Sequence, residues 1–207
     1  MPAIHRSRPP SRVLDPEGSL TLLAPQVAHA PALVEAIHAS LPALRGYMPW
    51  AHLPQTPDTQ YERLVGVCAE YWRGDNFHFH LVDPARPDVM LGCVGLHPAG
   101  GHRGALEVGY WIRSDRAGHG LATRAARLAT WLAFARFGCV RVQCVYEPTN
   151  AASARAAEKV GFEREAILKG LNSAGTDAMR ANGWTSTGDD WVTSLAPERS
   201  PPGLRAG

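Results

Sequence analysis

Two glycines separated by one residue, Gly118 and Gly120, stand at the start of an Ala- and Leu-rich stretch with helical spacing. The first turn of a helix has four unpaired backbone N–H groups and a partial positive charge. Glycines at this point let an anion approach the backbone, because no side chain intervenes. The pair therefore predicts a loop that holds a phosphate-bearing ligand against the start of a helix.

Two common phosphate loops do not fit this spacing. A P-loop requires a Gly-Lys pair, which does not follow these glycines. A dinucleotide fingerprint requires a third glycine where this chain has Thr123, and an acidic residue near the end of the next strand, where the chain reads CVRVQC. The spacing therefore argues against a P-loop protein and against an NAD-linked oxidoreductase.

Three other polar side chains near these glycines could take part in chemistry. Glu107 lies in a strand-like segment, two residues before Gly109, and Trp111 is its neighbour by alternation. This carboxylate could act as a general base, or it could be an ordinary solvated carboxylate on a strand. Asn150 and Ser153 open a later helix, where Asn150 could simply cap the N-terminus and Ser153 could be a first-turn serine.

Metal and redox chemistry find little support in the sequence. His78 and His80 alternate on one face of a predicted strand, but no third ligand stands nearby in sequence, so we predict no metal site. The four cysteines form no C-x-x-C pair; they are Cys68, Cys93, Cys139 and Cys144. We expect them to be free thiols, buried, in a reducing compartment.

The elements that must position these residues follow from hydrophobic periodicity. Helices are expected at residues 27–44, 59–74, 116–138 and 149–162, and strands at 20–25, 76–84, 88–98, 105–114, 139–148, 162–170 and 189–195. Residues 45–58 and 171–188 are predicted loops. This interleaved order predicts an α/β (α+β) architecture around a mixed sheet.

Length and composition indicate one domain. The chain has 207 residues, of which 45% are hydrophobic, enough for a single core. We expect a disordered leader at 1–18, a domain at 19–196 and a disordered tail at 197–207. No apolar run approaches the roughly 18 residues of a membrane span, and the leader lacks the apolar segment of a secretory signal. A cytoplasmic protein without a membrane partner is expected, and a net charge of +2 gives no evidence for nucleic acid binding.

The order of elements around the glycines resembles the GNAT superfamily of acetyl-CoA-dependent N-acetyltransferases. The resemblance runs from Leu106 to Gly170 and includes LEVGYWI, the Gly-x-Gly-x-Ala loop with its helix, the next strand, and N-x-x-S…K-x-G-F. The chain is most similar to the RimJ/RimL branch, the ribosomal-protein N-terminal acetyltransferases, to which YMPWA (Tyr47 to Ala51) adds a weaker match. The family's first Gln/Arg position is Ala117 here, with Arg116 one residue earlier, and His119 stands where many relatives carry Lys or Arg.

This resemblance implies a GNAT fold, a twisted and mostly antiparallel sheet that splits between its two central strands and is flanked by helices. It also implies acetyl-CoA as cosubstrate, without a metal. The implied coenzyme contacts are Tyr110, Trp111, Ile112, Arg113, Ala117, Gly118, His119, Gly120, Leu121, Ala122, Thr123 and Asn150. Ser153 would protonate or hydrogen-bond the departing thiolate, and Glu107, or an ordered water, would be the base.

The implied acceptor is a primary amine that attacks directly in a ternary complex, and the branch favours the α-amine of a protein or peptide. An α-amine with a pKa near 7.8 is roughly 15% neutral at pH 7, so it needs a weaker base than a lysine near 10.4. Tyr47, Trp50 and His52 would form the acceptor wall. A small-molecule amine (antibiotic, polyamine or amino acid) and a non-catalytic acyl-CoA sensor remain alternatives, and a homodimer is compatible with the branch.

Overall fold

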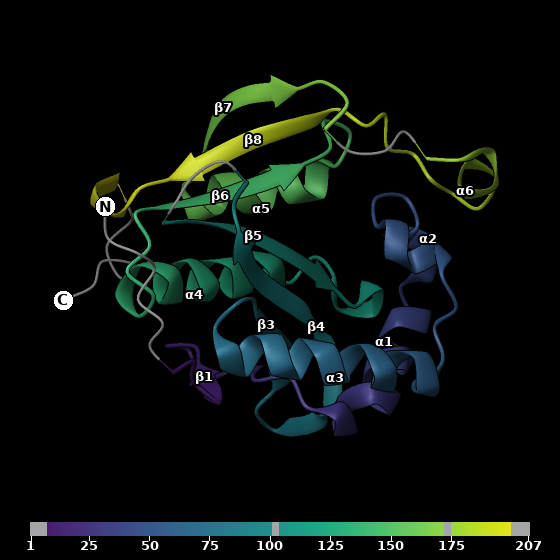
Figure 1. Cartoon of the computed structure of the whole chain (residues 1–207), viewed down its shortest axis with the longest axis horizontal. Helices are drawn as coiled ribbons and strands as arrows, with labels where there is room; N and C mark the ends of the chain where they lie inside the picture. The colour runs from purple at the N-terminus through teal and green to yellow at the C-terminus, as the bar shows by residue number, and fades with distance from the viewer. Residues whose placement is uncertain (1–7, 101–103, 172–174, 200–207) are drawn as a thin grey trace.

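The computed structural model of the chain describes residues 8–100, 104–171 and 175–199. Within these residues, eight strands form one sheet with the order β1-β2-β3-β4-β5-β6-β8-β7 (Figure 1). The strands are β1 (Arg12–Leu14), β2 (Thr21–Leu23), β3 (Phe77–Asp83), β4 (Arg86–Pro98), β5 (Ala105–Ile112), β6 (Arg141–Tyr146), β7 (Glu163–Leu168) and β8 (Asp190–Leu195). The helices are α1 (Ala30–His38), α2 (Leu41–Leu44), α3 (Pro57–Arg73), α4 (Leu121–Ala135), α5 (Ala151–Val160) and α6 (Asp177–Ala181). The expected mixed α/β fold is confirmed.

The centre of the sheet is split. Neighbouring strands pair antiparallel except β5 and β6, which are parallel. Their pairing covers only three residue pairs, the last of them Glu107 with Gln143, although both strands continue further. Beyond this point β5 and β6 diverge (Figure 1), which leaves an opening in the middle of the sheet.

Two apolar clusters cover opposite faces of the sheet. Because successive side chains of a strand point to opposite faces, Val108 and Tyr110 of β5 pack in the cluster that includes α4, whereas Trp111 packs against the cluster of α1 and α3. Helix α4 connects β5 to β6 and lies over the start of the split. The two faces therefore offer different surroundings to any molecule that enters the opening.

Local signals explain the length of α3, which forms one wall of the site. Thr56 and Thr59 bond reciprocally in a capping box, which satisfies N–H groups at the helix start. Pro57 takes the first helical position, where its missing N–H is not needed. The helix ends at Gly74, whose φ of 76° lies in the left-handed region that glycine adopts readily.

The helix predicted over residues 27–44 is interrupted in the structure. It consists of a 3-10 turn at Val27–His29, then α1, then the short α2. Pro42 lacks the N–H that a continuous helix would need there. The hydroxyl of Ser40 donates to the carbonyl of Ala36 at 2.8 Å and accepts from the backbone N–H of Ser114 at 3.0 Å. These bonds fix the turn between the helices and tie it to the end of β5.

The prediction of a disordered leader over residues 1–18 is wrong for residues 8–18. Residues 12–14 form β1, which pairs with β2, and Asp15 is buried. The polar and proline-rich composition concealed this hairpin, because a three-residue edge strand carries almost no periodic signal. The rest of the predicted leader and the predicted tail from residue 200 lie outside the described residues.

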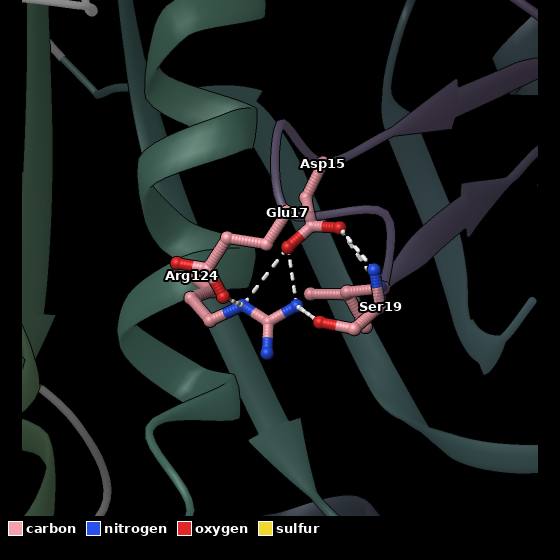
Figure 2. Close-up of polar contacts among 5 residues, drawn as sticks. Asp15, Glu17, Ser19 and Arg124 are labelled. Carbon is pink, nitrogen blue, oxygen red and sulfur yellow. Dashed lines mark hydrogen bonds and ion pairs between the residues drawn. The ribbon is translucent and has the colours of Figure 1, made fainter.

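Figure 2 shows how this hairpin is fastened to α4. The guanidinium of Arg124 donates to the carboxylate of Asp15, with Nε 3.0 Å from Oδ2, and to the hydroxyl of Ser19 at 2.6 Å. The backbone N–H groups of Ser19 and Leu20 donate to the other carboxylate oxygen. Burial alone would raise the pKa of Asp15, but the N–H of Leu20 and the Arg124 charge hold that pKa below its usual value. Since Arg124 directly follows the glycine loop, the hairpin fixes the first turn of α4.

Candidate active site

The glycine loop has the geometry of an open backbone cradle. Gly118 has a φ of 84° and Gly120 a φ of 74°, which side-chain-bearing residues rarely adopt. A Cβ at either position would meet no atom within 4 Å, so both glycines face open space. Gly120 is the N-cap of α4, without a side-chain capping bond. The backbone N–H groups of the first turn are therefore left to bind a ligand.

A cavity of about 400 Å³ lies in front of this loop. Most of the predicted coenzyme contacts line it; they are Tyr110, Trp111, Ile112, Ala117, Gly118, Gly120, Leu121, Ala122, Thr123 and Asn150. Ser153 lines it as well. Arg116, which precedes the family's Gln/Arg position by one residue, and Arg155 and Lys159, which the sequence analysis did not select, complete the lining with positive charge. This charge and the helix N-terminus together suit an anionic ligand.

Two of the predicted coenzyme contacts lie elsewhere. The guanidinium of Arg113 bonds Glu35 and Asp115, each at 2.9 Å, and does not line this cavity. His119 is exposed and also outside the lining. The side chains of these two residues therefore point away from the cradle, and only their backbones belong to the segment that forms it.

The split exposes backbone groups of β5. In an antiparallel pair, residues alternate between bonding the partner strand and pointing away from it. Arg113 donates its N–H to Leu91 of β4 at 2.8 Å, which places Trp111 in the bonding position toward β4. The N–H and C=O groups of Tyr110 and Ile112 therefore face the opening, where β6 has diverged.

The hydroxyls of Ser153 and Tyr110, two residues that line this cavity, contact each other. The Ser153 hydroxyl donates to the Tyr110 hydroxyl at 3.3 Å, and the Tyr110 hydroxyl lies 3.3 Å from the carbonyl of Ser153. Asn150 caps α5, because its side chain accepts the Ser153 N–H at 3.0 Å. Burial raises the pKa of Tyr110 well above its usual value. Tyr110 therefore stays protonated near neutral pH and can donate a hydrogen bond.

A second cavity, of about 690 Å³, lies on the other face of β5, between the sheet and helices α1 and α3. Its apolar walls include Leu33, Ile37, Trp50 and Val67, and its polar lining includes Gln55, Gln60, Arg63, His78, His80, Cys93 and His97. Both cavities include Met48, Tyr110 and Trp111 in their linings. The two spaces thus meet at the diverging part of β5.

The histidines of the second cavity are neutral near pH 7. Burial lowers the pKa of His78 to about 3, with further lowering by His97 and Arg63. Burial likewise lowers the pKa of His80 to about 3, and its ring Nδ1 lies 2.6 Å from the Nδ1 of His29. These groups were noticed in the sequence for their alternation, but their place in a cavity depends on how α3 packs over the sheet.

Glu107 stands beside this cavity. Its carboxylate accepts a hydrogen bond from Gln143 at 3.0 Å, and it lies directly opposite His97 in the register of β4 and β5. The His97 ring is 4.6 Å from that of His78, measured between centroids. Burial lowers the pKa of His97, while Glu107 opposes that shift. The Glu107 carboxylate therefore lies between β6, at the start of the split, and the histidines of the second cavity, although it does not line either cavity itself.

The three residues predicted for the acceptor wall separate in the structure. Trp50 lines the second cavity, 6.1 Å from Trp111 between ring centroids. Tyr47 lines the first cavity, and its hydroxyl lies 3.4 Å from the carbonyl of Thr149. His52 lines neither; its ring nitrogen bonds the carbonyl of Arg45 at 2.9 Å. We assign His52 a structural role in the loop.

The segment predicted as a loop at 171–188 supports this region. It contains α6, and residues 172–174 lie outside the described part. Thr185 donates both its N–H and its hydroxyl to the carbonyl of Gly46, at 3.1 and 3.0 Å. Trp184 packs on the ring of His52. The buried carboxylate of Glu147 accepts from the hydroxyl of Ser186 and from the backbone N–H of Gly188. The segment therefore fixes the loop of residues 45–58, which we call the aromatic loop and which contributes to the linings of both cavities.

No cluster of three or more His, Cys, Asp or Glu side chains among the described residues has the arrangement of a metal site. In the same residues, no helix has the length and apolar character needed to cross a membrane.

Comparison with known proteins agrees with this geometry. Residues 19–163, more than half of the chain, match the family model described as an acetyltransferase (GNAT) domain. The probable N-acetyltransferase YjcK of Bacillus subtilis (strain 168) is 30% identical over 117 residues, which are 55% of this chain and 63% of that protein. The match thus spans less than two thirds of the relative's length.

Solved structures show the same fold at low sequence identity. RimJ of Mycobacterium smegmatis in complex with CoA-disulfide superimposes with a TM-score of 0.76 and 21% identity, covering 92% of this chain and 88% of that one. The microcin C7 self-immunity acetyltransferase MccE, in complex with acetyl-CoA and AMP, gives a TM-score of 0.72 and 17% identity, covering 86% and 92%. The resemblance inferred from the glycine loop is confirmed, and the chain belongs to the GNAT acetyltransferase family.

Proposed function

We propose that this chain is an N-acetyltransferase that moves the acetyl group of acetyl-CoA to a primary amine, with the α-amine of a protein or peptide as the preferred acceptor. The observation that carries the proposal is the meeting of two cavities at Tyr110 and Trp111. One cavity has the features of a coenzyme site. The other has room for an amine beside it.

The residues present fit acetyl-CoA. The N–H groups at the start of α4 and the charges of Arg116, Arg155 and Lys159 can bind phosphates. The exposed backbone groups of Tyr110 and Ile112 can pair with the amides of the pantetheine arm, as an added strand would. The bound thioester supplies the electrophilic carbonyl for the reaction.

The amine must lose its proton before it can attack. The second cavity places the positive Arg63 near neutral histidines, and none of the described residues in its lining carries a carboxylate, so its surroundings favour the neutral amine over the ammonium. We propose that Glu107 accepts the proton, directly or through an ordered water, with His97 as its nearest relay toward the cavity.

The departing thiolate must be stabilised as the acetyl group leaves. We propose that the hydroxyl of Ser153 donates a hydrogen bond to it. In the structure Ser153 donates this proton to Tyr110, which the sequence analysis selected as a coenzyme contact, at 3.3 Å. We propose that the Ser153 proton turns to the sulfur during the reaction and that Tyr110, which stays protonated, then donates to the Ser153 oxygen. Hydrogen bonds to charged groups contribute about 1.5–3 kcal/mol. Because the negative charge on sulfur develops only as the acetyl group leaves, this bond should affect the rate and not the binding of the coenzyme.

A small-molecule amine is the second candidate acceptor. The volume of about 690 Å³ lies within the range of roughly 300–1,000 Å³ seen for small-ligand sites. The wall of helices α1 and α3 also limits how much of a folded protein could enter.

Thermal unfolding with and without acetyl-CoA, combined with thiol release against peptides and small amines, tests this function. Ligand at about 100 times its Kd should add about 2.7 kcal/mol of stability. A shift accompanied by amine-dependent thiol release would support the transferase. A shift without release on any amine would favour the acyl-CoA sensor, and no shift at all would contradict the coenzyme site.

A further inference from the structure

The charge inside the second cavity is unusual for an enzyme that binds ammonium compounds. Among the described residues that line it, Arg63 is the only Arg or Lys side chain, and no aspartate or glutamate is found. The histidines His78 and His80 are neutral at pH 7, because burial and nearby positive groups hold their pKa values near 3. Two carboxylates, Glu70 and Glu107, act electrostatically on His97, but neither lines the cavity.

The guanidinium of Arg63 is held in place by a chain of amide side chains. Its Nε donates to Gln60 at 2.8 Å, and Gln60 donates to Gln55 at 2.6 Å. Gln55 in turn donates to the carbonyls of Trp50 and Leu53. Gln60 is 4% exposed and Gln55 8% exposed, so the chain is part of the packed wall and also fastens the aromatic loop to α3.

Arg63 itself is exposed while it lines the cavity, which places its charge where the cavity opens. No ion pair with a carboxylate is found for it within the described residues. Its charge nevertheless reaches inward, because it acts on His78, His80 and Cys93. A guanidinium in a fixed position, with donors left over, is suited to a carboxylate.

Resting on the proposed function, we infer that the acceptor is a monoamine with an apolar body and a carboxylate group, and that Arg63 selects it by binding that carboxylate. The apolar walls at Leu33, Ile37 and Val67 would contact the body, and the amine would lie toward Trp111, where the two cavities meet. Polyamines, aminoglycosides and lysine-rich peptides are disfavoured, because each brings a second ammonium group into a cavity that offers it no carboxylate.

Two sources can supply this chemistry, a free amino-acid-like molecule and a protein N-terminus with an acidic side chain close behind it. The experiment uses a matched set for each. The small amines are 4-(aminomethyl)benzoate, its carboxamide, and 1,4-bis(aminomethyl)benzene, which share one apolar ring. The peptides are tripeptide amides with the same first two residues and glutamate, glutamine or lysine in third place.

Acetyl-CoA-dependent thiol release gives KM and kcat for each amine with the full chain. In at least one set, the KM of the carboxylate compound should be about tenfold or more below that of its amide, and the diammonium compound should be the poorest. The set that shows the preference identifies the source. Arg63→Gln should raise the KM of the carboxylate compound to that of the amide, and Arg63→Lys should keep part of the preference.

Other results would overturn the inference. Equal KM values for carboxylate and amide in both sets, faster acetylation of the diammonium compounds, or an unchanged ratio in Arg63→Gln would each show that Arg63 does not select the acceptor, while leaving the transferase in place. The stability shift with acetyl-CoA should be the same in Arg63→Gln and the natural chain, which shows that the variant is folded. Thiol release from none of the six amines, in a protein still stabilised by acetyl-CoA, would contradict the transferase proposal and the inference with it.

Discussion

The hydroxyl pair of Ser153 and Tyr110 joins α5 to the diverging part of β5, on the wall of the smaller cavity. Ser153→Ala should lower kcat by about 10- to 100-fold, because it removes one hydrogen bond to a charged leaving group. The stability shift with acetyl-CoA should remain. Tyr110→Phe is the matched control, since it keeps the ring and removes only the neighbouring hydroxyl. If Tyr110→Phe lowers kcat and Ser153→Ala does not, the donor is the phenol and our assignment of Ser153 is wrong.

Two side chains next to Glu107 could take part in the proton transfer, those of Gln143 and His97. Glu107→Gln should lower kcat/KM for the amine by about 10²–10⁴-fold, the usual contribution of a general base. It should leave the KM for acetyl-CoA unchanged. The comparison variant is His97→Asn, which removes the proposed relay and should have the smaller effect. Full activity in Glu107→Gln together with loss of activity in His97→Asn would move the base from the strand carboxylate to the cavity histidine.

Sequence alone located the coenzyme side of the site far better than the acceptor side. Gly118, Gly120 and Asn150 lie within short, contiguous motifs whose spacing reflects one helix start each, so the chain order already describes the local geometry. Arg63 of α3 and His97 of β4 are 34 positions apart in the sequence, and only the packing of α3 on the sheet brings them to one cavity. No spacing rule connects them, and the amide chain that orients Arg63 is a tertiary feature.

At the scale of elements, two glycines lie opposite each other in the middle of the sheet, Gly95 of β4 and Gly109 of β5. Both line the larger cavity, so no side chain occupies this part of its floor. A Cβ on Gly95 would lie 2.8 Å from a ring nitrogen of His97 and 3.3 Å from one of His78. Gly95→Ala should therefore displace these rings, at a cost of about 1 kcal/mol in stability, and raise the acceptor KM about fivefold. Acetyl-CoA binding should be unaffected.

Gly109→Ala provides a matched control for this change, because a Cβ there would meet no atom within 4 Å. It adds the same methyl group to the same cavity without moving a histidine. Steady-state kinetics and thermal unfolding of both variants make the comparison. Equal effects on the acceptor KM would mean that cavity volume, and not the position of the rings, governs acceptor binding.

The attachment of the N-terminal hairpin to α4 should make stability depend on pH. The folded-state pKa of Asp15 is below its unfolded value of about 3.9, so its contribution is fully present above that value and is lost as the pH falls through the folded-state pKa. At pH 7, Asp15→Asn should reduce the free energy of unfolding by about 1.5–3 kcal/mol. Below about pH 4 the difference from the natural chain should shrink.

Glu17 is the control for that prediction, because it stands in the same hairpin but its side chain is 69% exposed and lies 3.6 Å from Arg124. Glu17→Gln should change stability by no more than about 0.5 kcal/mol. Urea unfolding at pH 7 and at pH 3.5 measures both variants. An Asp15→Asn difference that persists undiminished at the lower pH would rule out the charge as the source of the stability.

At the scale of the whole molecule, two cavities that share a wall allow both substrates to be bound at once. Initial rates measured against both substrates should therefore give intersecting double-reciprocal lines. Cys93 is the one thiol in the lining of the larger cavity, and burial raises its pKa to about 12, so it is protonated and a poor nucleophile. Cys93→Ser should retain the intersecting pattern. Parallel lines, or acetylated protein detected by mass spectrometry in the absence of an amine, would contradict direct transfer.

Much of the architecture could be predicted from periodicity and from the family resemblance, including the order of strands and helices from β2 onward. The interruption between α1 and α2, the hairpin partner β1 and the helix α6 could not. Each of these is short, and its stability comes from contacts made by distant residues, such as Arg124 on Asp15 or Thr185 on Gly46. Local preference is weak over three to five residues, so the tertiary contacts decide.

In the described part of the sheet, only three residue pairs join strands β1–β5 to strands β6–β8. A sheet interrupted at its centre resists shear and bending least at that line, because few backbone bonds cross it. A molecule bound between the diverging strands would then stiffen the connection between strands β1–β5 and strands β6–β8 as well as react. Its departure would leave the two parts of the sheet freer to bend relative to each other. The short pairing of β5 with β6 would then govern both product release and the elasticity of the fold.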